Sequence, residues 1–426
     1  MNHFQVRDGE LWCEGVRLAD LAREVGTPFY VYSSATLSRH FEVFQGALAA
    51  HADQLGDPLV AFAVKANSNL SVLTTLARLG AGADTVSEGE IRRALKAGVP
   101  GEKIVFSGVG KTDAELAFAL EAGVYQINVE AEPELRRLAR IAADKGVRAP
   151  FVVRVNPKVG AGGHAKITTG GAGDKFGVDA EEALRLYAEA AAAPSLQPLG
   201  LACHIGSQIT DLGPLEAAFG VMRGLVERLR GQGLEVSRLD LGGGLGVPYF
   251  NQQEPPSPED FAAMVARTVG GLGVRYVFEP GRMIVANAGV LVSRVIHIHG
   301  RPDGGRRFLV LDAAMNDLMR PALYDAFHDI RPVRVREGAS KLAYDVVGPV
   351  CETGDTFSRD RELPEAAEGD LIAFMSAGAY GAVMGSEYNT RPLAPEVLVR
   401  EGQWSVVRRR PTYDEIFARE PAAAWL

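Results

Sequence analysis

The 426-residue sequence has few cysteines and no concentrated positive charge. Its three cysteines, Cys13, Cys203 and Cys351, lie far apart, which excludes a disulfide framework and a cysteine-based metal motif. Free thiols at this frequency fit a reducing compartment such as the cytoplasm. The formal net charge is −8 and the basic residues form no block, so we expect neither a nucleic-acid surface nor a contact with anionic membranes.

Long apolar stretches are also missing. The sequence contains no run of about 18 apolar residues, so no transmembrane helix is expected. Residues 1–16 lack the basic-then-apolar pattern of a secretory signal, which again favours a cytoplasmic protein. With 47% hydrophobic and 23% charged residues the composition is that of a globular protein, and the length predicts two domains.

Short β-rich runs recur between residues 59 and 282, separated by segments with helical periodicity. They occupy residues 59–67, 82–87, 103–108, 125–130, 151–157, 199–208, 238–246 and 275–282. Between them, Ser87 and Thr112 each precede a glutamate by three residues, as in a capping box, and Ser257 precedes a proline. Eight strands alternating with helices predict an α/β fold, a (β/α)8 TIM-type barrel over residues 35–285.

The pattern changes after about residue 286, where strand-like runs follow one another with few helices between them. We predict a mainly β C-terminal domain over residues 286–426. The first 34 residues contain a hairpin-like run at 4–15 and a strand-like run at 28–33. We expect these N-terminal strands, residues 1–34, to pack with the β domain.

Polar residues with catalytic potential gather at the carboxyl ends of the predicted strands, the face where barrel enzymes place their active sites. They are Lys65, Asp84, Ser107, Asn128, Asn156, His204, the glycines 242–244 and Glu279. The glycine-rich segment 160–177, after the fifth predicted strand, is expected to be a loop of the same site.

Residues 105–112 read VFSGVGKT, which raises the question of an ATP-binding loop. A P-loop has the pattern Gly-x-x-x-x-Gly-Lys-Ser/Thr, and Val105 stands where its first glycine belongs. Thr112 with Glu115 is more typical of a helix N-terminus. We therefore expect a tight strand-to-helix turn here and no ATP site.

Glycines instead follow the seventh and eighth predicted strands, at 242–244 and at Gly281. Barrels often bind phosphate with these two loops, because glycine lets backbone N–H groups approach the oxygens. Lys65, after the first strand, is either a salt-bridge partner of Asp84 or a lysine whose amine forms a Schiff base. A Schiff-base lysine facing a phosphate site would fit pyridoxal phosphate.

Five motifs, taken in order, resemble those of pyridoxal-phosphate decarboxylases with an alanine-racemase-like barrel: FAVKAN, HIGSQ, LGGGLG, EPGR and GPVCETGD. Residues 312–330 and 379–399 are specifically similar to the diaminopimelate decarboxylase family. The resemblance covers nearly the whole chain. It implies the decarboxylation of meso-2,6-diaminopimelate to L-lysine and CO2 with pyridoxal 5′-phosphate, the last step of bacterial lysine biosynthesis.

The resemblance also implies a role for each matching residue. Lys65 would carry the cofactor as a Schiff base, Glu279 would pair with the pyridine nitrogen, His204 would stack on the ring, and Cys351 would donate a proton. The remaining implied cofactor-binding residues are Asp84, Ser207, Gly243, Gly244, Gly281, Arg282 and Tyr380. The implied substrate-binding residues are Arg282, Arg320, Tyr324, Glu352 and Tyr380.

Other functions on the same fold remain open, namely an ornithine/arginine-type decarboxylase, an amino-acid racemase, or a relative without catalysis. Arg320 and Glu352 favour a substrate whose far end carries a carboxylate and an ammonium group. Glu279 favours decarboxylation, because the racemases of this fold use an arginine at the equivalent place. The resemblance implies a homodimer with active sites shared between subunits. Two lone histidines, His297 and His299, predict no metal site.

Overall fold

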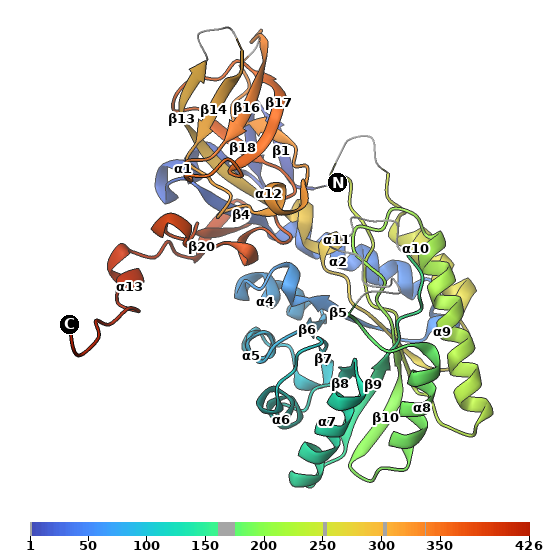
Figure 1. The fold of residues 1–426 in the computed structure, drawn as a ribbon. Coiled ribbons are helices and arrows are strands. Elements are labelled where there is room, and N and C mark those ends of the chain that lie inside the picture. The colour runs from blue at the N-terminus through green and yellow to red at the C-terminus, as the bar shows by residue number, and fades with distance from the viewer. Residues whose placement is uncertain (1, 161–174, 250–253, 301–304, 337) are drawn as a thin grey trace. The chain divides into compact units, whose positions relative to one another are not determined.

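The computed structural model describes residues 2–160, 175–249, 254–300, 305–336 and 338–426 (Figure 1). The chain forms two compact units, one of residues 38–284 and the other of residues 1–37 together with 285–426. Most of the predicted loop at 160–177 lies outside the described residues. Among the described helices, none has the length and hydrophobicity needed to span a membrane.

The unit of residues 38–284 is a closed parallel barrel, with strand order β10-β11-β12-β5-β6-β7-β8-β9. The strands are β5 (Leu59–Ala63), β6 (Gly82–Thr85), β7 (Ile104–Phe106), β8 (Gln126–Val129), β9 (Ala149–Arg154), β10 (Leu196–Ala202), β11 (Arg238–Asp240) and β12 (Arg275–Phe278). Strands β5 to β8 are buried along their whole length, as expected for strands covered on both faces. The predicted (β/α)8 barrel is confirmed.

Helices connect the barrel strands and lie outside their ring (Figure 1). They are α2 (Ser34–Ala49), α3 (Ala52–Leu55), α4 (Leu70–Arg78), α5 (Glu88–Lys96), α6 (Asp113–Glu121), α7 (Glu132–Asp144), α8 (Ala180–Ala191), α9 (Gly213–Gly231), α10 (Pro258–Val269) and α11 (Arg282–Val285). Helix α7 buries Leu135, Leu138 and Ala142, an i, i+3, i+7 stripe that faces the strands.

The predicted helix caps are present, with one difference. Thr112 and Glu115 form a reciprocal capping box at the start of α6. Ser87 caps α5, because its side chain accepts a hydrogen bond from the Glu90 N–H. The Glu90 carboxylate, however, accepts the N–H of Val86 instead of the N–H of Ser87. The predicted capping box at Ser87 is therefore only half formed.

The second unit is mainly β. Its 9-stranded sheet runs β17-β16-β14-β13-β4-β19-β20, with β18 on β13 and β15 on β18. The strands are β4 (Phe29–Ser33), β13 (Gly289–Gly300), β14 (Arg307–Leu311), β15 (Ile330–Pro332), β16 (Lys341–Val347), β17 (Thr356–Pro364), β18 (Leu371–Phe374), β19 (Glu396–Arg400) and β20 (Gln403–Arg408). Short helices are α1 (Leu18–Val25), α12 (Arg320–Tyr324) and α13 (Tyr413–Phe417).

The N-terminal strands belong to this β unit, as the sequence predicts. Strand β4 pairs antiparallel with β13 and parallel with β19, so it lies in the middle of the sheet. The hairpin of β1 (Phe4–Arg7) and β2 (Glu10–Cys13), extended by β3 (Val16–Arg17), forms a 3-stranded sheet. Side chains from both ends of the chain, such as Leu11, Phe29, Val290 and Val397, share one buried cluster.

Candidate active site

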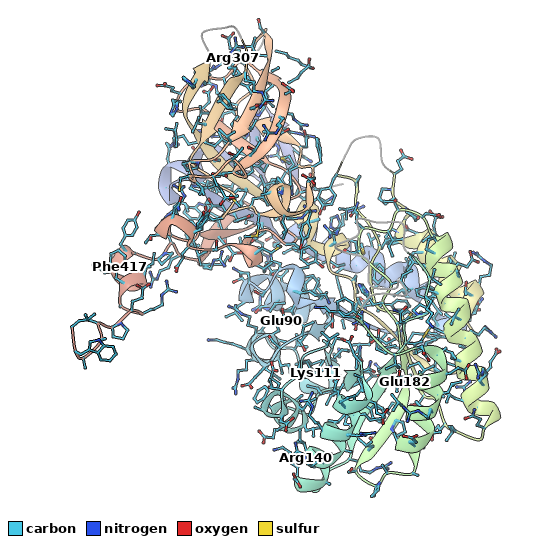
Figure 2. All side chains as sticks on the ribbon, in the orientation of Figure 1. Glu90, Lys111, Arg140, Glu182, Arg307 and Phe417 are labelled. Carbon is cyan, nitrogen blue, oxygen red and sulfur yellow. The ribbon has the colours of Figure 1, made fainter. Side chains whose placement is uncertain are left out.

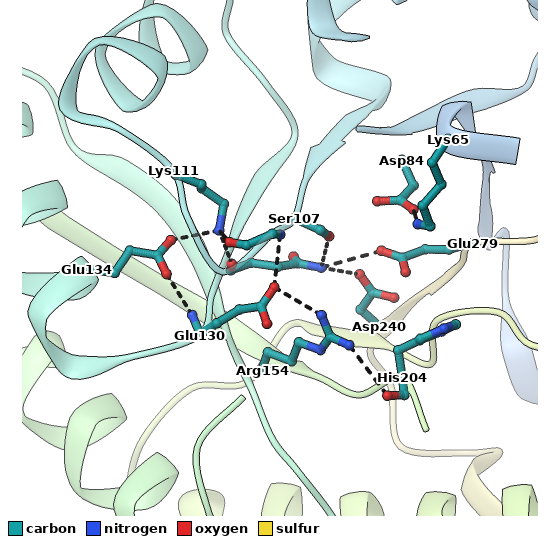
Figure 3. A network of polar contacts seen from close by, with 12 residues as sticks. Lys65, Asp84, Ser107, Lys111, Glu130, Glu134, Arg154, His204, Asp240 and Glu279 are labelled. Atoms are coloured by element: carbon teal, nitrogen blue, oxygen red, sulfur yellow. Dashed lines mark hydrogen bonds and ion pairs between the residues drawn. The ribbon is translucent and has the colours of Figure 1, made fainter. Parts of the chain in front are cut away.

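Lys65 lies just beyond β5, in the 3-10 turn η1 (Val64–Ala66), at the carboxyl end of the barrel. Its ammonium group forms an ion pair with Asp84 on β6 (Figure 3). The Asp84 side chain is fully buried, whereas 36% of the Lys65 side chain is exposed. The second carboxylate oxygen of Asp84, Oδ1, has no hydrogen-bond partner among the described residues. Asp84 thus holds a reachable lysine amine at the barrel mouth.

A buried carboxyl pair, Asp240 at the end of β11 and Glu279 just after β12, lies beside this ion pair (Figure 3). Asn128 Nδ2 donates to Asp240 Oδ2 at 3.0 Å, to Glu279 Oε1 at 3.4 Å and to Ser107 Oγ at 3.0 Å. Gln126 Nε2 donates to the same Asp240 oxygen at 3.0 Å. One amide therefore links both carboxyl groups across the barrel interior.

Burial changes the proton affinity of both carboxyl groups. It raises the pKa of Asp240 to about 6, against the hydrogen bonds from Gly242 N–H and Asn128 that favour the charged form. Burial raises the pKa of Glu279 well above its usual range, and the charges of Asp240 and Asp84 add to the effect. Both shifts favour the protonated, uncharged form of the carboxyl groups.

Two further ion pairs are buried in the same network of polar contacts (Figure 3). Arg154 Nη1 donates to Glu130 Oε1 at 3.0 Å, and both side chains are at least nine-tenths buried. Lys111, labelled in Figure 2, is buried and donates to Glu134 Oε1, the Asn128 carbonyl and the Gly108 carbonyl at 2.6 to 2.7 Å. All of its donors are used within the protein. The VFSGVGKT segment is a strand-to-helix turn closed by this lysine.

His204 follows β10 and is fixed by the glycine loop after β11. The Gly243 N–H donates to its Nδ1 at 3.1 Å, so the neutral imidazole carries its proton on Nε2. Burial, and then the charges of Arg154 and Lys65, lower the pKa of His204 well below its usual range. A neutral ring in this position is suited to stacking on another flat ring.

The glycine loops leave no room for side chains. A Cβ on Gly243 would lie 2.2 Å from the Glu279 carbonyl oxygen, and a Cβ on Gly281 would lie 3.0 Å from the Ala63 Cβ. Gly244 has a φ of +118°, which L-residues rarely adopt. The loops after β11 and β12 therefore bring bare backbone close together, as glycine-rich loops that approach a ligand closely do.

A cationic side chain completes this cradle. Arg282 donates to Ser207 Oγ from Nε at 3.3 Å and from Nη2 at 3.1 Å, and its Nη1 donates to the Tyr249 hydroxyl at 2.8 Å. A hydroxyl and a buried guanidinium beside glycine backbone fit a phosphate group. With the amine of Lys65 and the carboxyl of Glu279 at the same strand ends, the donor set fits pyridoxal phosphate.

The remaining predicted residues lie in the β unit. Arg320, on α12, is buried; its Nη1 donates to His328 Nε2 at 2.8 Å, and His328 Nδ1 donates to the Met375 carbonyl at 2.9 Å. Tyr324 ends the same helix. Tyr380, between β18 and β19, has a left-handed backbone, with a φ of 55°.

Cys351 and Glu352 lie on the loop between β16 and β17. Both are exposed. Glu352 Oε2 accepts the Tyr388 hydroxyl at 2.9 Å, and the Cys351 thiol lies 3.5 Å from Asn389 Oδ1. The other two cysteines are buried.

Several polar residues of the barrel interior were missed by the sequence prediction. Gln126, Arg154 and Asp240 sit within predicted strands, and nothing local shows that they point inward. Glu90, labelled in Figure 2, was identified only as part of a helix cap; burial raises its pKa to about 7, and the charges of Lys65 and Asp84 also act on it. For Arg154 and Asp240, a position at the carboxyl end of a strand was the one available signal, whereas Gln126 begins β8 and Glu90 lies on α5.

Known proteins share both the sequence and this architecture. The family described as "Pyridoxal-dependent decarboxylase, pyridoxal binding domain" matches residues 39–286. Diaminopimelate decarboxylase from Pseudomonas aeruginosa is 51% identical over 421 residues, which cover 99% of each chain.

Solved structures agree with the sequence relatives. Diaminopimelate decarboxylase from Helicobacter pylori, complexed with L-lysine, has a TM-score of 0.90 at 39% identity and covers 95% of this chain and 99% of its own. The enzyme from M. jannaschii, also with L-lysine, has a TM-score of 0.93 at 35% identity over 100% of both chains.

The fold and the matched domain define a pyridoxal-phosphate-dependent decarboxylase with a barrel and a β domain. Within that class, the chain belongs to the diaminopimelate decarboxylase family.

Proposed function

We propose that the protein decarboxylates meso-2,6-diaminopimelate to L-lysine and CO2 with pyridoxal 5′-phosphate. One observation carries the proposal: in a chain 51% identical from end to end to a diaminopimelate decarboxylase, Lys65, His204 and Glu279 all lie at the carboxyl ends of the barrel strands. The alternatives, an ornithine/arginine-type decarboxylase and a racemase, lack comparable support.

The barrel residues would hold the cofactor at distinct points. Lys65 would bind its aldehyde carbon, and His204 would lie against the ring face. Ser207 and Arg282, together with the backbone of Gly243, Gly244 and Gly281, would hold the phosphate; Tyr380 and Asp84 are the further contacts we propose. When bound, pyridoxal phosphate supplies an electron sink for the charge left after CO2 departs.

Glu279 would control the proton on the ring nitrogen. Burial raises the pKa of its carboxyl group well above the usual range, which suits it to share a proton with a basic nitrogen. Asn128, which donates to both Glu279 and Asp240, would hold the two carboxyl groups in fixed positions relative to each other. Asp84 would accept a hydrogen bond from the Lys65 amine and hold it at the mouth.

Substrate selection would come from the β unit and Arg282. The far end of diaminopimelate carries a carboxylate and an ammonium group. Arg320, held by His328, and Tyr324 would bind the carboxylate with Arg282, and Glu352 would bind the ammonium group. The Cys351 thiol would deliver the proton that replaces the lost carboxylate.

We further propose a homodimer whose active sites are shared between subunits, and a cytoplasmic location, where the three free cysteines stay reduced. Mixing Lys65→Ala and Cys351→Ala subunits should then restore part of the activity, because one of the two sites in a mixed dimer would be intact. Subunit exchange without any recovery would argue against shared sites.

The assignment of Lys65 is tested by reducing the pyridoxal-phosphate-loaded protein with borohydride and mapping the label by peptide mass spectrometry. We expect the pyridoxyl group on Lys65 alone, because its amine is reachable, and no label on buried Lys111. A pyridoxyl group on another residue, or on the Lys65→Ala variant, would contradict the assignment of Lys65 as the Schiff-base lysine.

A further inference from the structure

The loop that carries Cys351 is fixed at its base. Asp355, which is buried, accepts the Val350 N–H and the Met315 N–H, each at 2.7 Å. A Cβ on Gly348 would lie 2.4 Å from the Asp355 carboxylate, so the loop passes directly over it. These hydrogen bonds hold both ends of the loop. The position of Cys351 at the tip therefore depends on other contacts.

A second segment reaches the same tip from the other side. Asn316, the neighbour of Met315, pairs with Ser386 through two hydrogen bonds: Ser386 N–H to the Asn316 carbonyl at 3.0 Å, and Asn316 Nδ2 to the Ser386 carbonyl at 2.9 Å. The chain that follows Ser386 includes Tyr388 and Asn389. The cysteine loop and this segment are therefore anchored to consecutive residues of one turn.

The segment meets the tip residue by residue. Tyr388 donates its hydroxyl to Glu352 at 2.9 Å. The Asn389 amide oxygen, Oδ1, lies 3.3 Å from the Cys351 backbone nitrogen and 3.5 Å from its Sγ, and it accepts from both. Asn389 has a left-handed backbone, with φ 57° and ψ 26°, a conformation that asparagine tolerates better than most residues.

We propose that Asn389 is a positioning residue for the Cys351 thiol. This rests on the proposed function in one respect, the use of Cys351 as the proton donor. One amide oxygen that accepts both the N–H and the S–H of the same residue fixes the direction of the side chain relative to its own backbone. The hydrogen bond from the S–H group to Asn389 is lost when a thiol ionises, so removing this acceptor should ease the ionisation of the thiol.

Iodoacetamide alkylation of the pyridoxal-phosphate-loaded protein reports this contact without reference to turnover. The reagent reacts with the thiolate, and Cys13 and Cys203 are buried, with pKa values raised mainly by burial. Peptide mass spectrometry assigns the label to Cys351, and a Cys351→Ser variant should lose it.

Two substitutions of Asn389 should act in opposite directions. Asn389→Gly keeps the left-handed backbone and removes the acceptor, so Cys351 should react about threefold faster at neutral pH. Asn389→Asp keeps the acceptor and adds negative charge, which disfavours the thiolate, so the reaction should be about tenfold slower. Tyr388→Phe, which breaks only the contact to Glu352, is the matched control and should leave the rate unchanged.

Opposite shifts with an unchanged control support the proposal, because general loosening of the loop would accelerate alkylation in every variant. Rates that are equal to wild type, or that move in the same direction for Asn389→Gly and Asn389→Asp, overturn it. Full decarboxylase activity of Cys351→Ser would remove Cys351 from the proposed reaction, and the alkylation rates would still decide the role of Asn389.

Discussion

The cofactor site depends on a glycine that cannot be replaced by alanine without moving backbone. A Cβ on Gly243 would lie 2.2 Å from the Glu279 carbonyl oxygen and 2.9 Å from its carbonyl carbon. Neither atom can rotate away, and the neighbouring Glu279 N–H to Gly242 carbonyl bond, at 2.7 Å, holds the two loops together. Gly243→Ala must therefore push the loops after β11 and β12 apart.

The magnitude follows from the cost of overpacking, typically 1–3 kcal/mol. In the Gly243→Ala apoprotein, the loops that would hold the phosphate can open and relieve about 2 kcal/mol of this steric strain. Cofactor binding must close the loops again and restore the strain. The dissociation constant for pyridoxal phosphate should then rise about 30-fold. Gly110→Ala is the matched control, because a Cβ there meets no atom within 4 Å and the position lies in the VFSGVGKT turn.

Equilibrium titration of the apoprotein with pyridoxal phosphate, followed by absorbance, measures both variants, with circular dichroism to verify the fold. We expect strong weakening for Gly243→Ala and wild-type affinity for Gly110→Ala. A folded Gly243→Ala protein that binds within twofold of wild type would refute the assignment of the cradle. Weakening by Gly110→Ala instead would point to the VFSGVGKT turn as the phosphate site.

Three other predictions concern charged groups. Lys111→Met leaves Glu134 buried without its cation and should lower the free energy of unfolding by about 3–5 kcal/mol; an unchanged urea midpoint would contradict it. Arg320→Met should lower kcat/KM for diaminopimelate about 100-fold, and an unchanged kcat/KM would count against it. The folded-state pKa of Asp240 is raised to about 6, so its contribution to stability is present below its unfolded pKa of 3.8 and is lost as the pH rises through 6. Relative to wild type, Asp240→Asn should therefore gain stability between pH 4 and 7, and a constant difference across that range in denaturant unfolding would rule this out.

The strands of the barrel were predictable because each carries its own signal, a short apolar run followed by glycine or polar residues. The prediction failed at finer detail. The run that includes Lys65 was predicted as strand to residue 67, but β5 ends at Ala63, and the lysine is placed by a 3-10 turn. A single turn after a strand has no periodicity by which sequence could reveal it.

For the barrel residues of the site, the sequence predicted that they lie at the ends of strands, but it did not predict most of the contacts between them. Lys65 and Asp84 meet, as one of the two readings of Lys65 required. The link from Asn128 to Asp240 and Glu279 was not predictable, because it joins β8 to β11 and β12, which are not neighbours of β8 in the barrel. The predicted capping box at Ser87 was only half right for a similar reason. The Glu90 carboxylate can accept from the Val86 N–H as well as from the Ser87 N–H, and residue preferences at helix ends do not distinguish between the two donors.

The central claim is tested most directly by CO2 release from the purified, pyridoxal-phosphate-loaded protein. meso-Diaminopimelate, L-ornithine and L-arginine would be offered separately, and the amine product identified. We expect CO2 and L-lysine from diaminopimelate alone. CO2 only from another substrate would contradict the roles of Arg320 and Glu352, and racemised substrate without CO2 would contradict decarboxylation itself.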